Sequence, residues 1–360
     1  MTGSILLVDD NAETLKGLSL RLSETLNDEA KIVEWQPTEG DGDMSAALND
    51  RIGADTVLVV TDYDLTTTVK GLFGLTIVSW CQKVFVPVGD FSRGNLTALP
   101  KEPNLFEMRI PTDHTAAAYI ANAFRGFRDI RALIGRNRPL LTEGASLAGV
   151  LAEVLERPYL ESQFAAYMSR LGAANSFLLQ KLREFAGPAE PDDDEKIQIL
   201  SYVLGHVLLN AILKYPGPIL SLNGIAAYIA TVPAEAGAIE EVFGTARYRG
   251  PFSALGPLYW RDDVDNILDE LGKNTGNQTF DGFGDFNRHV VSGKIGRELQ
   301  PHLCNRCDGL KGGYWCPFTS RPVCEREDCS VAASSWIPQG AQLSRVEREF
   351  YDEWAPILGM

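Results

Sequence analysis

Two sets of residues in this sequence have the types and spacing of metal ligands. The first set begins with Asp9 and Asp10, adjacent carboxylates that directly follow the apolar run 5–8. A second apolar run, 56–61, ends in the same way at Asp62. Continuous apolar runs of this length predict strands that are buried on both faces, as in a parallel sheet.

The position of these acids at strand ends predicts a magnesium pocket. In a doubly wound sheet, ligands bind at the carboxyl ends of the strands, near the point where the strand order reverses. Neighbouring strands would therefore bring Asp9, Asp10 and Asp62 together. Carboxylates at close range repel one another unless a cation neutralises them, and Mg2+ prefers oxygen ligands.

The second set is a group of cysteines near the C-terminus. Five of the six cysteines lie between residues 304 and 329, and clustering of this kind without a secretion signal favours metal over disulfides. The preferred ligands of a structural zinc ion are Cys304, Cys307, Cys324 and Cys329, in a Cys-x2-Cys and a Cys-x4-Cys pair. Cys316 or His302 are the alternatives for one of these positions. An iron–sulfur cluster, redox-active thiols and buried free cysteines stay open as other interpretations.

The N-terminal third resembles a known family. Residues 4 to 128 resemble a response-regulator receiver domain through the segments 5–11 and 57–65, with Gly71 or Gly74 where the family has a glycine that opens the third helix. The resemblance implies that Asp62 accepts a phosphoryl group from a histidine kinase or phosphotransfer protein. It also implies that Asp9, Asp10 and Asp62 hold Mg2+.

Two positions depart from the family pattern. The family has a Thr or Ser at the end of the fourth strand, where we expect Val88 and Gly89, with Ser92 nearby but out of register. The family also has a lysine before a proline at the end of the fifth strand. Ile110 stands there, and Arg109, one residue away, is a weak candidate for the switch cation because it would point to the other face.

Composition limits the classes of function. The chain has 360 residues and a net charge of -15, which argues against general nucleic-acid binding because such binding needs a basic surface. No signal peptide or membrane-spanning run is expected, so the predicted location is the cytoplasm.

The predicted organisation has three parts. The fold class is an α/β doubly wound, five-stranded parallel receiver domain, followed by a mostly α-helical region with a C-terminal cysteine-rich metal module. The expected boundaries are 1–132 for the receiver domain, 140–280 for the helical output domain and 285–360 for the zinc module with a closing helix. The fourth strand is expected at 84–88 and the third helix at 68–82.

Two further groups of residues are conspicuous in the central region. His206 lies on an apolar helix and is interpreted as a hydrogen-bonded core histidine rather than a phosphoacceptor. The segment Trp260, Arg261, Asp262 and Asp263 is either a recognition surface or a plug at a domain interface, and we favour the plug.

The leading hypothesis is an atypical response regulator that acts through contact with a downstream protein, with a homodimer as one form. A first alternative is a receiver-like scaffold that is not phosphorylated. A second alternative is an enzyme of unknown type in the C-terminal region, although no recognised catalytic motif is found there.

Overall fold

The computed structural model describes residues 3–91, 105–137, 146–168, 193–273, 279–307, 309, 313–333 and 335–356. Contacts divide the chain into two compact units. Of the described residues, unit 1 holds those up to Glu156, those from 193 to Asn210, and Gly250–Leu255. Unit 2 holds Arg157 to 168, Ala211–Arg249 and the described residues from Gly256 onward. The three predicted domain boundaries stay predictions.

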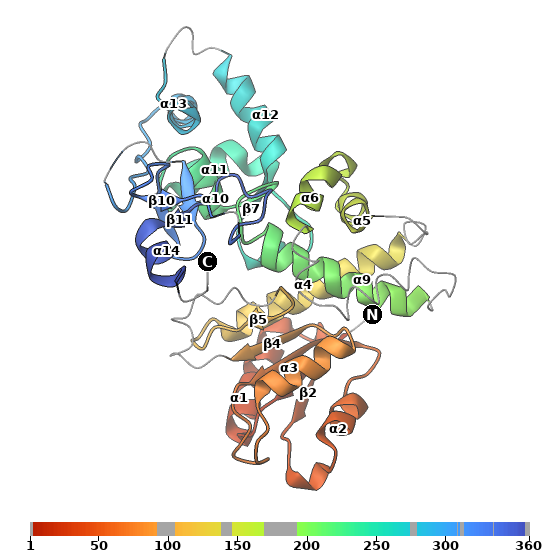
Figure 1. The fold of residues 1–360 in the computed structure, drawn as a ribbon. Coiled ribbons are helices and arrows are strands. Elements are labelled where there is room, and N and C mark those ends of the chain that lie inside the picture. The colour runs from red at the N-terminus through yellow and green to blue at the C-terminus, as the bar shows by residue number, and fades with distance from the viewer. Residues whose placement is uncertain are drawn as a thin grey trace. The chain divides into compact units, whose positions relative to one another are not determined.

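Unit 1 is built on a five-stranded parallel sheet with the order β2-β1-β3-β4-β5, which confirms the predicted α/β class (Figure 1). The strands are β1 Gly3–Val8, β2 Ala30–Trp35, β3 Thr56–Asp62, β4 Val88–Phe91 and β5 Met108–Arg109. Its helices are α1 Ala12–Leu26, α2 Met44–Arg51, α3 Gly74–Lys83, α4 Ala116–Arg136, α5 Leu147–Val154 and α9 Asp193–Val207, with the short turns Glu39–Asp41 and Ser253–Leu255. A π-helical turn, Leu208–Ile212, follows α9.

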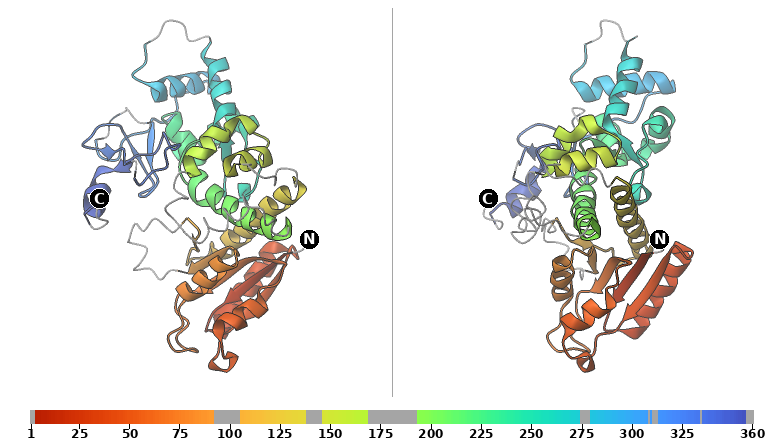
Figure 2. Two further views of the ribbon diagram at one scale, coloured as in Figure 1. Left: turned by 45° about the vertical axis from the view of Figure 1, so that its right-hand side comes forward. Right: turned by 90° about the vertical axis from the view of Figure 1, so that its right-hand side faces the viewer.

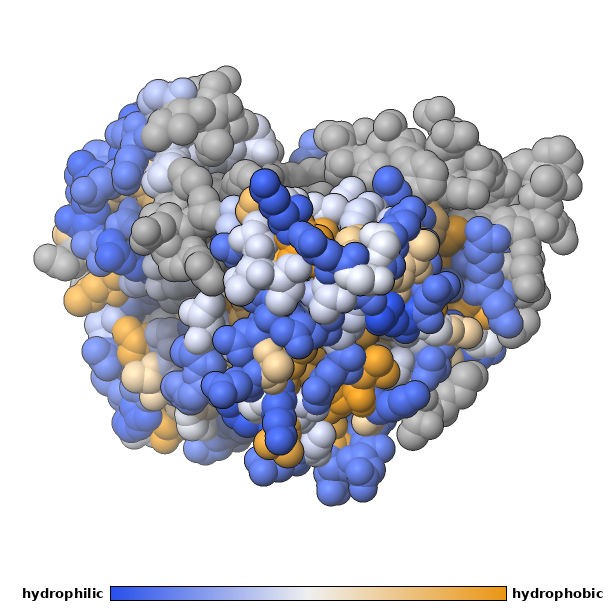
Figure 3. Space-filling model, turned by 90° about the horizontal axis from the view of Figure 1, so that it is seen from below, coloured by the Kyte–Doolittle hydropathy of each residue, from blue (hydrophilic) through white to orange (hydrophobic). Residues whose placement is uncertain are grey.

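Helices cover both faces of this sheet. Leu6, Val8 and Val59 pack against α2 and α3 on one face. On the other face α4 contacts β3 and also α1, and α9 packs against α4 (Figures 1 and 2). Because both faces are covered, β1 and most of β3 are buried, as their apolar sequences predict. The face seen in Figure 3 is mostly hydrophilic, with hydrophobic side chains in small separate groups.

The prediction for the fourth strand is wrong. The chain leaves α3 through a tight turn in which Phe85 adopts a left-handed φ of 55° and the Val86 N–H donates to the Cys81 carbonyl at 3.1 Å. This is the hydrogen-bond pattern of a helix-ending Schellman motif, so residues 84–86 belong to the helix end. β4 therefore ends at Phe91 instead of Val88. Ser92, the next residue in the sequence, lies outside the described residues.

The third helix also begins later than predicted, at Gly74 instead of residue 68. The preceding segment turns back on itself, because Gly71 has a φ of 80° and Asp64 pairs with Phe73 in an isolated antiparallel bridge. The sequence pattern missed this turn because several apolar residues in it have helical spacing.

Unit 2 is only partly helical, so the prediction of a mostly helical region is too strong. Its helices are α6 Glu161–Met168, α10 Leu222–Tyr228, α11 Ala236–Phe243, α12 Arg261–Gly272, α13 Phe283–Ile295 and α14 Arg348–Trp354, with short 3-10 turns at Pro158–Leu160, Pro233–Glu235 and Gly244–Ala246. Three antiparallel pairs join β6 Ile219–Ser221 to β7 Leu258–Trp260, β8 Tyr314–Cys316 to β9 Arg321–Val323, and β10 Ser330–Val331 to β11 Val346–Glu347. In the described part of the chain, no helix combines the length and the apolar character needed to cross a membrane.

Candidate metal centres

An acidic cluster lies at the carboxyl edge of the parallel sheet. Asp9 directly follows β1, and Asp62 is the last residue of β3, the strand that pairs with β1. Strand order reverses between these two strands, since β2 lies on the far side of β1 and β4 on the far side of β3. This edge is the place where doubly wound sheets bind their ligands.

The three predicted carboxylates meet there. Asp9, Asp10 and Asp62 each offer an oxygen, and these oxygens lie within 4.8 Å of one another. Asp9 is buried, while Asp10 and Asp62 are half-buried. Three carboxylates at this range repel strongly, and a hard divalent cation is the group that suits such an oxygen set.

Backbone N–H groups fix the orientation of these acids. The Asn11 N–H donates to the Asp9 carboxylate at 2.7 Å, and the Thr67 N–H donates to Asp10 at 2.9 Å. Gln36 holds the Asp10 carbonyl with its side-chain amide at 2.8 Å. The bond from Thr67 ties the loop after β3 to the loop after β1, and together these bonds orient Asp9 and Asp10.

Gly74 allows the helix start to approach the strand end. Its N–H donates to the Tyr63 carbonyl at 2.8 Å. A Cβ atom at position 74 would lie only 2.2 Å from the carbonyl oxygen of Asp62. Of the two glycines singled out in the sequence, Gly74 is therefore the one that opens α3 beside the acidic cluster.

The register of β5 separates Arg109 from this cluster. Arg109 pairs with Asp90, and Asp90 pairs with Thr61, the residue before Asp62. Because side chains alternate along a strand, Arg109 belongs to the opposite face of the sheet from Asp62. Its position gives no support to a role as the switch cation.

Asp90 is a buried acid that sequence reasoning missed. Burial raises its pKa to about 6, and nearby Glu107 adds to this, while Arg109 acts in the opposite direction. A signal existed, because an acid inside an apolar strand is unusual. Because the fourth strand was predicted to end at Val88, Asp90 fell outside the expected strand and was not recognised as a buried acid.

The second cluster consists of the four preferred cysteines. The sulfur atoms of Cys304, Cys307, Cys324 and Cys329 all lie within 4.8 Å of one another. Cys307 Sγ and Cys324 Sγ are 3.8 Å apart. Zn–S bonds of about 2.3 Å in a tetrahedron place sulfur atoms roughly 3.8 Å apart, whereas a disulfide needs about 2.05 Å. The spacing therefore suits one tetrahedral metal ion and no disulfide.

The surroundings of the cysteines favour a bound cation. Burial and the neighbouring sulfur atoms raise the pKa of Cys329, and burial raises that of Cys324. Burial acts to raise the pKa of Cys304, but hydrogen bonds from the backbone N–H groups of Arg306, Cys307 and Cys324 and from the Cys324 thiol together lower it. A metal ion would allow all four thiols to ionise together.

The two alternative ligands lie outside this cluster. Cys316 is fully buried at the end of β8, and its sulfur accepts the Glu347 N–H at 3.3 Å. His302 is buried, and burial lowers its pKa to about 4. Neither belongs to the group of four sulfur atoms.

His206 lies in the core of unit 1. It is fully buried among Phe106, Phe127 and Tyr202, and burial lowers its pKa to about 3. Its Nδ1 lies 3.3 Å from the Asn210 side-chain nitrogen. This environment is that of a neutral packing residue, in keeping with the interpretation of His206 as a core histidine.

In comparisons with known proteins, no family model matches the sequence, and no curated protein and no solved structure matches it. The interpretation of both clusters rests on the sequence motifs and on the geometry described above.

Proposed function

We propose that the N-terminal α/β region is a receiver domain in which Asp62 accepts a phosphoryl group. The observation that carries the proposal is the meeting of Asp9, Asp10 and Asp62 at the carboxyl edge of the sheet, between β1 and β3. The strand order supports it, since doubly wound folds with the order 2-1-3-4-5 bind their ligands at this point.

The chemistry needs a nucleophile and a means of neutralising charge. In this proposal an Asp62 oxygen attacks the phosphorus of a phosphohistidine, the P–N bond breaks, and an acyl phosphate forms on Asp62. Mg2+ held by Asp9, Asp10 and Asp62 would neutralise the phosphoryl oxygens during transfer. The backbone bonds to Asp9 and Asp10 would keep the cation ligands oriented.

In the same proposal, the donor is a histidine kinase or phosphotransfer protein, and the output is contact with a downstream protein. The cysteine cluster would hold a structural zinc ion, because four thiolates form a closed site without an open position for a substrate. Its role would be to stabilise the fold of residues 304–329.

A second candidate is a receiver-like docking domain that is not phosphorylated. The observation that favours it is the register of β5, which places Arg109 on the wrong face to contact a phosphoryl group on Asp62. The group of three acids, Asp9, Asp10 and Asp62, argues against this second candidate, because a docking domain has no need of a cation site.

Uptake of phosphoryl from acetyl phosphate separates the two candidates. The full-length protein would be incubated with acetyl phosphate and Mg2+ and analysed by intact mass and phosphate-affinity electrophoresis. We expect one hydroxylamine-labile phosphoryl group, which Asp62→Asn abolishes.

Asp64→Asn is the matched control. Asp64 lies two residues away, and its carboxylate accepts hydrogen bonds from Thr66. We expect this variant to keep phosphoryl uptake. Absence of any adduct on wild-type protein with an intact fold would favour the docking domain.

A further inference from the structure

The segment 344–348, which we call the closing segment, contacts both cysteine pairs of the candidate metal centre. It contains β11 and the first residue of α14, and it follows the cysteines in the sequence. None of its residues belongs to the group of metal ligands. Groups that orient the ligands from outside are nevertheless part of a metal site, because affinity depends on how the ligands are held.

Arg345 holds the loop between Cys324 and Cys329. Its Nε donates to the Ser330 hydroxyl at 2.6 Å. Its Nη2 donates to the carbonyls of Glu325 and Ser330 at 3.2 and 3.3 Å. The Ser330 hydroxyl in turn donates to the Cys324 carbonyl at 2.5 Å. One guanidinium therefore reaches both ends of this loop, with Ser330 as its link to Cys324.

Two contacts fix the position of the Arg345 side chain and backbone. The guanidinium carbon lies 5.4 Å from the centre of the Tyr314 ring. The Arg345 N–H donates to the Trp315 carbonyl at 3.1 Å. A guanidinium presents its donors in a rigid planar fork, so it can bond several acceptors and lie over a ring at once. A lysine keeps the charge but loses this geometry.

Glu347 holds the loop between Cys304 and Cys307. Its side chain is buried, and its Oε1 accepts the side-chain amide of Asn305 at 2.7 Å. Asn305 is the residue that directly follows Cys304 in this short loop. Arg321 Nη1 lies 3.5 Å from the same oxygen. A buried carboxylate needs such donors, so Glu347 and Asn305 keep each other in place.

Backbone contacts join the closing segment to the second cysteine pair as well. Glu347 pairs with Ser330 in the β10–β11 ladder. The Arg348 N–H donates to the Cys329 carbonyl at 2.9 Å. Two cysteine loops that are distant in sequence therefore share one support.

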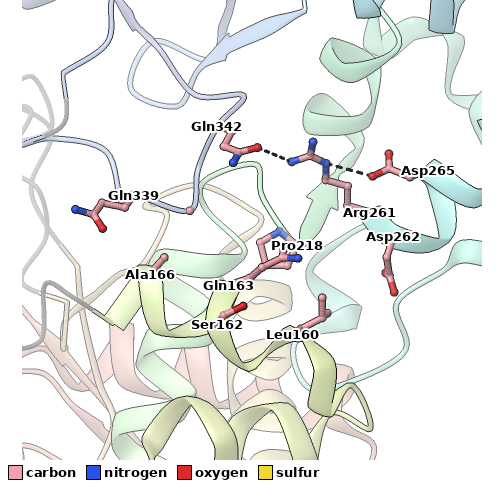
Figure 4. Close-up of a pocket in the computed structure, with 11 residues that line it drawn as sticks. Leu160, Ser162, Gln163, Ala166, Pro218, Arg261, Asp262, Asp265, Gln339 and Gln342 are labelled. Carbon is pink, nitrogen blue, oxygen red and sulfur yellow. Dashed lines mark hydrogen bonds and ion pairs between the residues drawn. The ribbon is translucent and has the colours of Figure 1, made fainter.

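The chain before the closing segment is anchored in unit 2 by contacts away from the cysteines. Leu343 lies in a hydrophobic core, and its carbonyl accepts the Trp315 N–H at 2.9 Å. Gln342 lines a cavity of about 410 Å³, where its Oε1 accepts a hydrogen bond from Arg261 at 3.4 Å (Figure 4). The fold of unit 2 therefore sets where Arg345 and Glu347 lie.

We propose that Arg345 and Glu347 are positioning residues of the metal centre, which hold the two cysteine pairs at the spacing that one tetrahedral ion needs. Neither residue supplies a ligand. The inference rests on the proposed metal site, and it predicts that loss of either side chain lowers metal affinity while the four sulfur ligands stay the same.

The test is a measurement of Kd for Zn2+ and Co2+ on the full-length protein, by competition with a chromophoric chelator. Arg345→Lys removes the fork, and Glu347→Ala removes the acceptor for Asn305. Each should weaken metal binding by about 10- to 100-fold. At saturation, the bound cobalt should keep the absorption of tetrahedral thiolate coordination, because the ligands are unchanged.

Two variants are controls. Arg348→Lys should bind metal as wild type does, since the Arg348 side chain pairs with Asp352 at 3.3 Å and only its backbone contacts the cysteine loop. Glu347→Gln keeps an acceptor for Asn305, so it should restore most of the affinity that Glu347→Ala loses.

The melting temperature separates positioning from a merely structural role. A structural role would destabilise the metal-free and metal-bound protein equally and leave Kd unchanged. Weaker metal binding instead reduces the stabilisation that the metal gives. We therefore expect Arg345→Lys and Glu347→Ala to lower the melting temperature more with metal than without it.

Unchanged Kd in both variants, with metal bound to wild type, would overturn the positioning role and leave the metal site intact. An equal loss of affinity in Arg348→Lys would also overturn it. Failure of the wild-type protein to bind either ion would overturn the metal site itself. Asn305→Ala removes the same hydrogen bond from an exposed residue, so the test holds even where Glu347→Ala does not fold.

Discussion

Gly74→Ala tests whether the start of α3 and the end of β3 must lie as close as the structure places them. The added Cβ would lie 2.2 Å from the Asp62 carbonyl oxygen and 3.1 Å from the Cα of Tyr63. Both are backbone atoms, so no side-chain rotation relieves the overlap. Either the helix start or the strand end must move.

The magnitude follows from two effects. Overpacking of a well-packed site costs about 1–3 kcal/mol. The hydrogen bond from the Gly74 N–H to the Tyr63 carbonyl would also be strained, and such a bond contributes about 1 kcal/mol. We therefore expect the free energy of unfolding to fall by about 2–4 kcal/mol. Because Asp62 is the residue displaced, phosphoryl uptake should fall as well.

Gly17→Ala is the control for the substitution itself. Gly17 lies inside α1, and the nearest atom to an added Cβ is the Arg21 Nη1 at 3.7 Å, an ordinary contact. Alanine favours a helix over glycine by about 1 kcal/mol, so this variant should be stabilised.

The assay is urea denaturation followed by circular dichroism, with the midpoint compared across the three proteins. The two variants should move the midpoint in opposite directions. A Gly74→Ala protein as stable as wild type, with unchanged phosphoryl uptake, would refute the close approach of α3 to Asp62.

Three further predictions concern groups elsewhere in the chain. Asp90 has a pKa raised from 3.8 to about 6, so stability should fall by about 3 kcal/mol in total as pH rises from below 3.8 to well above 6, and Asp90→Asn should flatten this slope in urea titrations. His206 has a pKa lowered from 6.5 to about 3, so its contribution is complete above pH 6.5 and is lost on acidification; His206→Leu should reduce this acid sensitivity. Elemental analysis should find one zinc per chain, lost in Cys304→Ser and retained in Cys316→Ser, and chelation should lower the melting temperature.

The parts of the fold that the sequence predicted well are those with local signals. The apolar runs before Asp9 and Asp62 gave β1 and β3 because buried parallel strands need continuous apolar side chains. Asp9, Asp10 and Asp62 stand at the carboxyl ends of these two strands, so the strand prediction was enough to predict that the three acids meet.

The four cysteines were predictable for a similar reason. Two closely spaced pairs can each bend around one ion, and the short β8–β9 hairpin lies between them in the sequence. The spacing alone did not decide among five cysteines and His302. The distances between ligand atoms did, because the sulfur atoms of the four preferred cysteines lie within 4.8 Å of one another, while Cys316 and His302 do not belong to this group.

Features that depend on distant contacts escaped prediction. Phe85 ends α3 in a left-handed conformation that a bulky residue rarely adopts, so no sequence rule placed β4 correctly. The cavity beside Arg261 takes its walls from four separate segments of the chain, which a linear reading cannot align. The antiparallel pairs of unit 2 are only two or three residues long, too short for a periodic pattern.

Beryllofluoride binding tests the central claim most directly, because this phosphoryl analogue needs the aspartate and the metal but no kinase. Fluorine NMR would be recorded on wild-type protein and on Asp62→Asn, with and without Mg2+. The proposed site predicts bound fluorine signals for wild type with Mg2+ alone, and their loss in the variant or without the metal. Absence of bound signals from folded wild-type protein at saturating Mg2+ would contradict a phosphoacceptor site at Asp62.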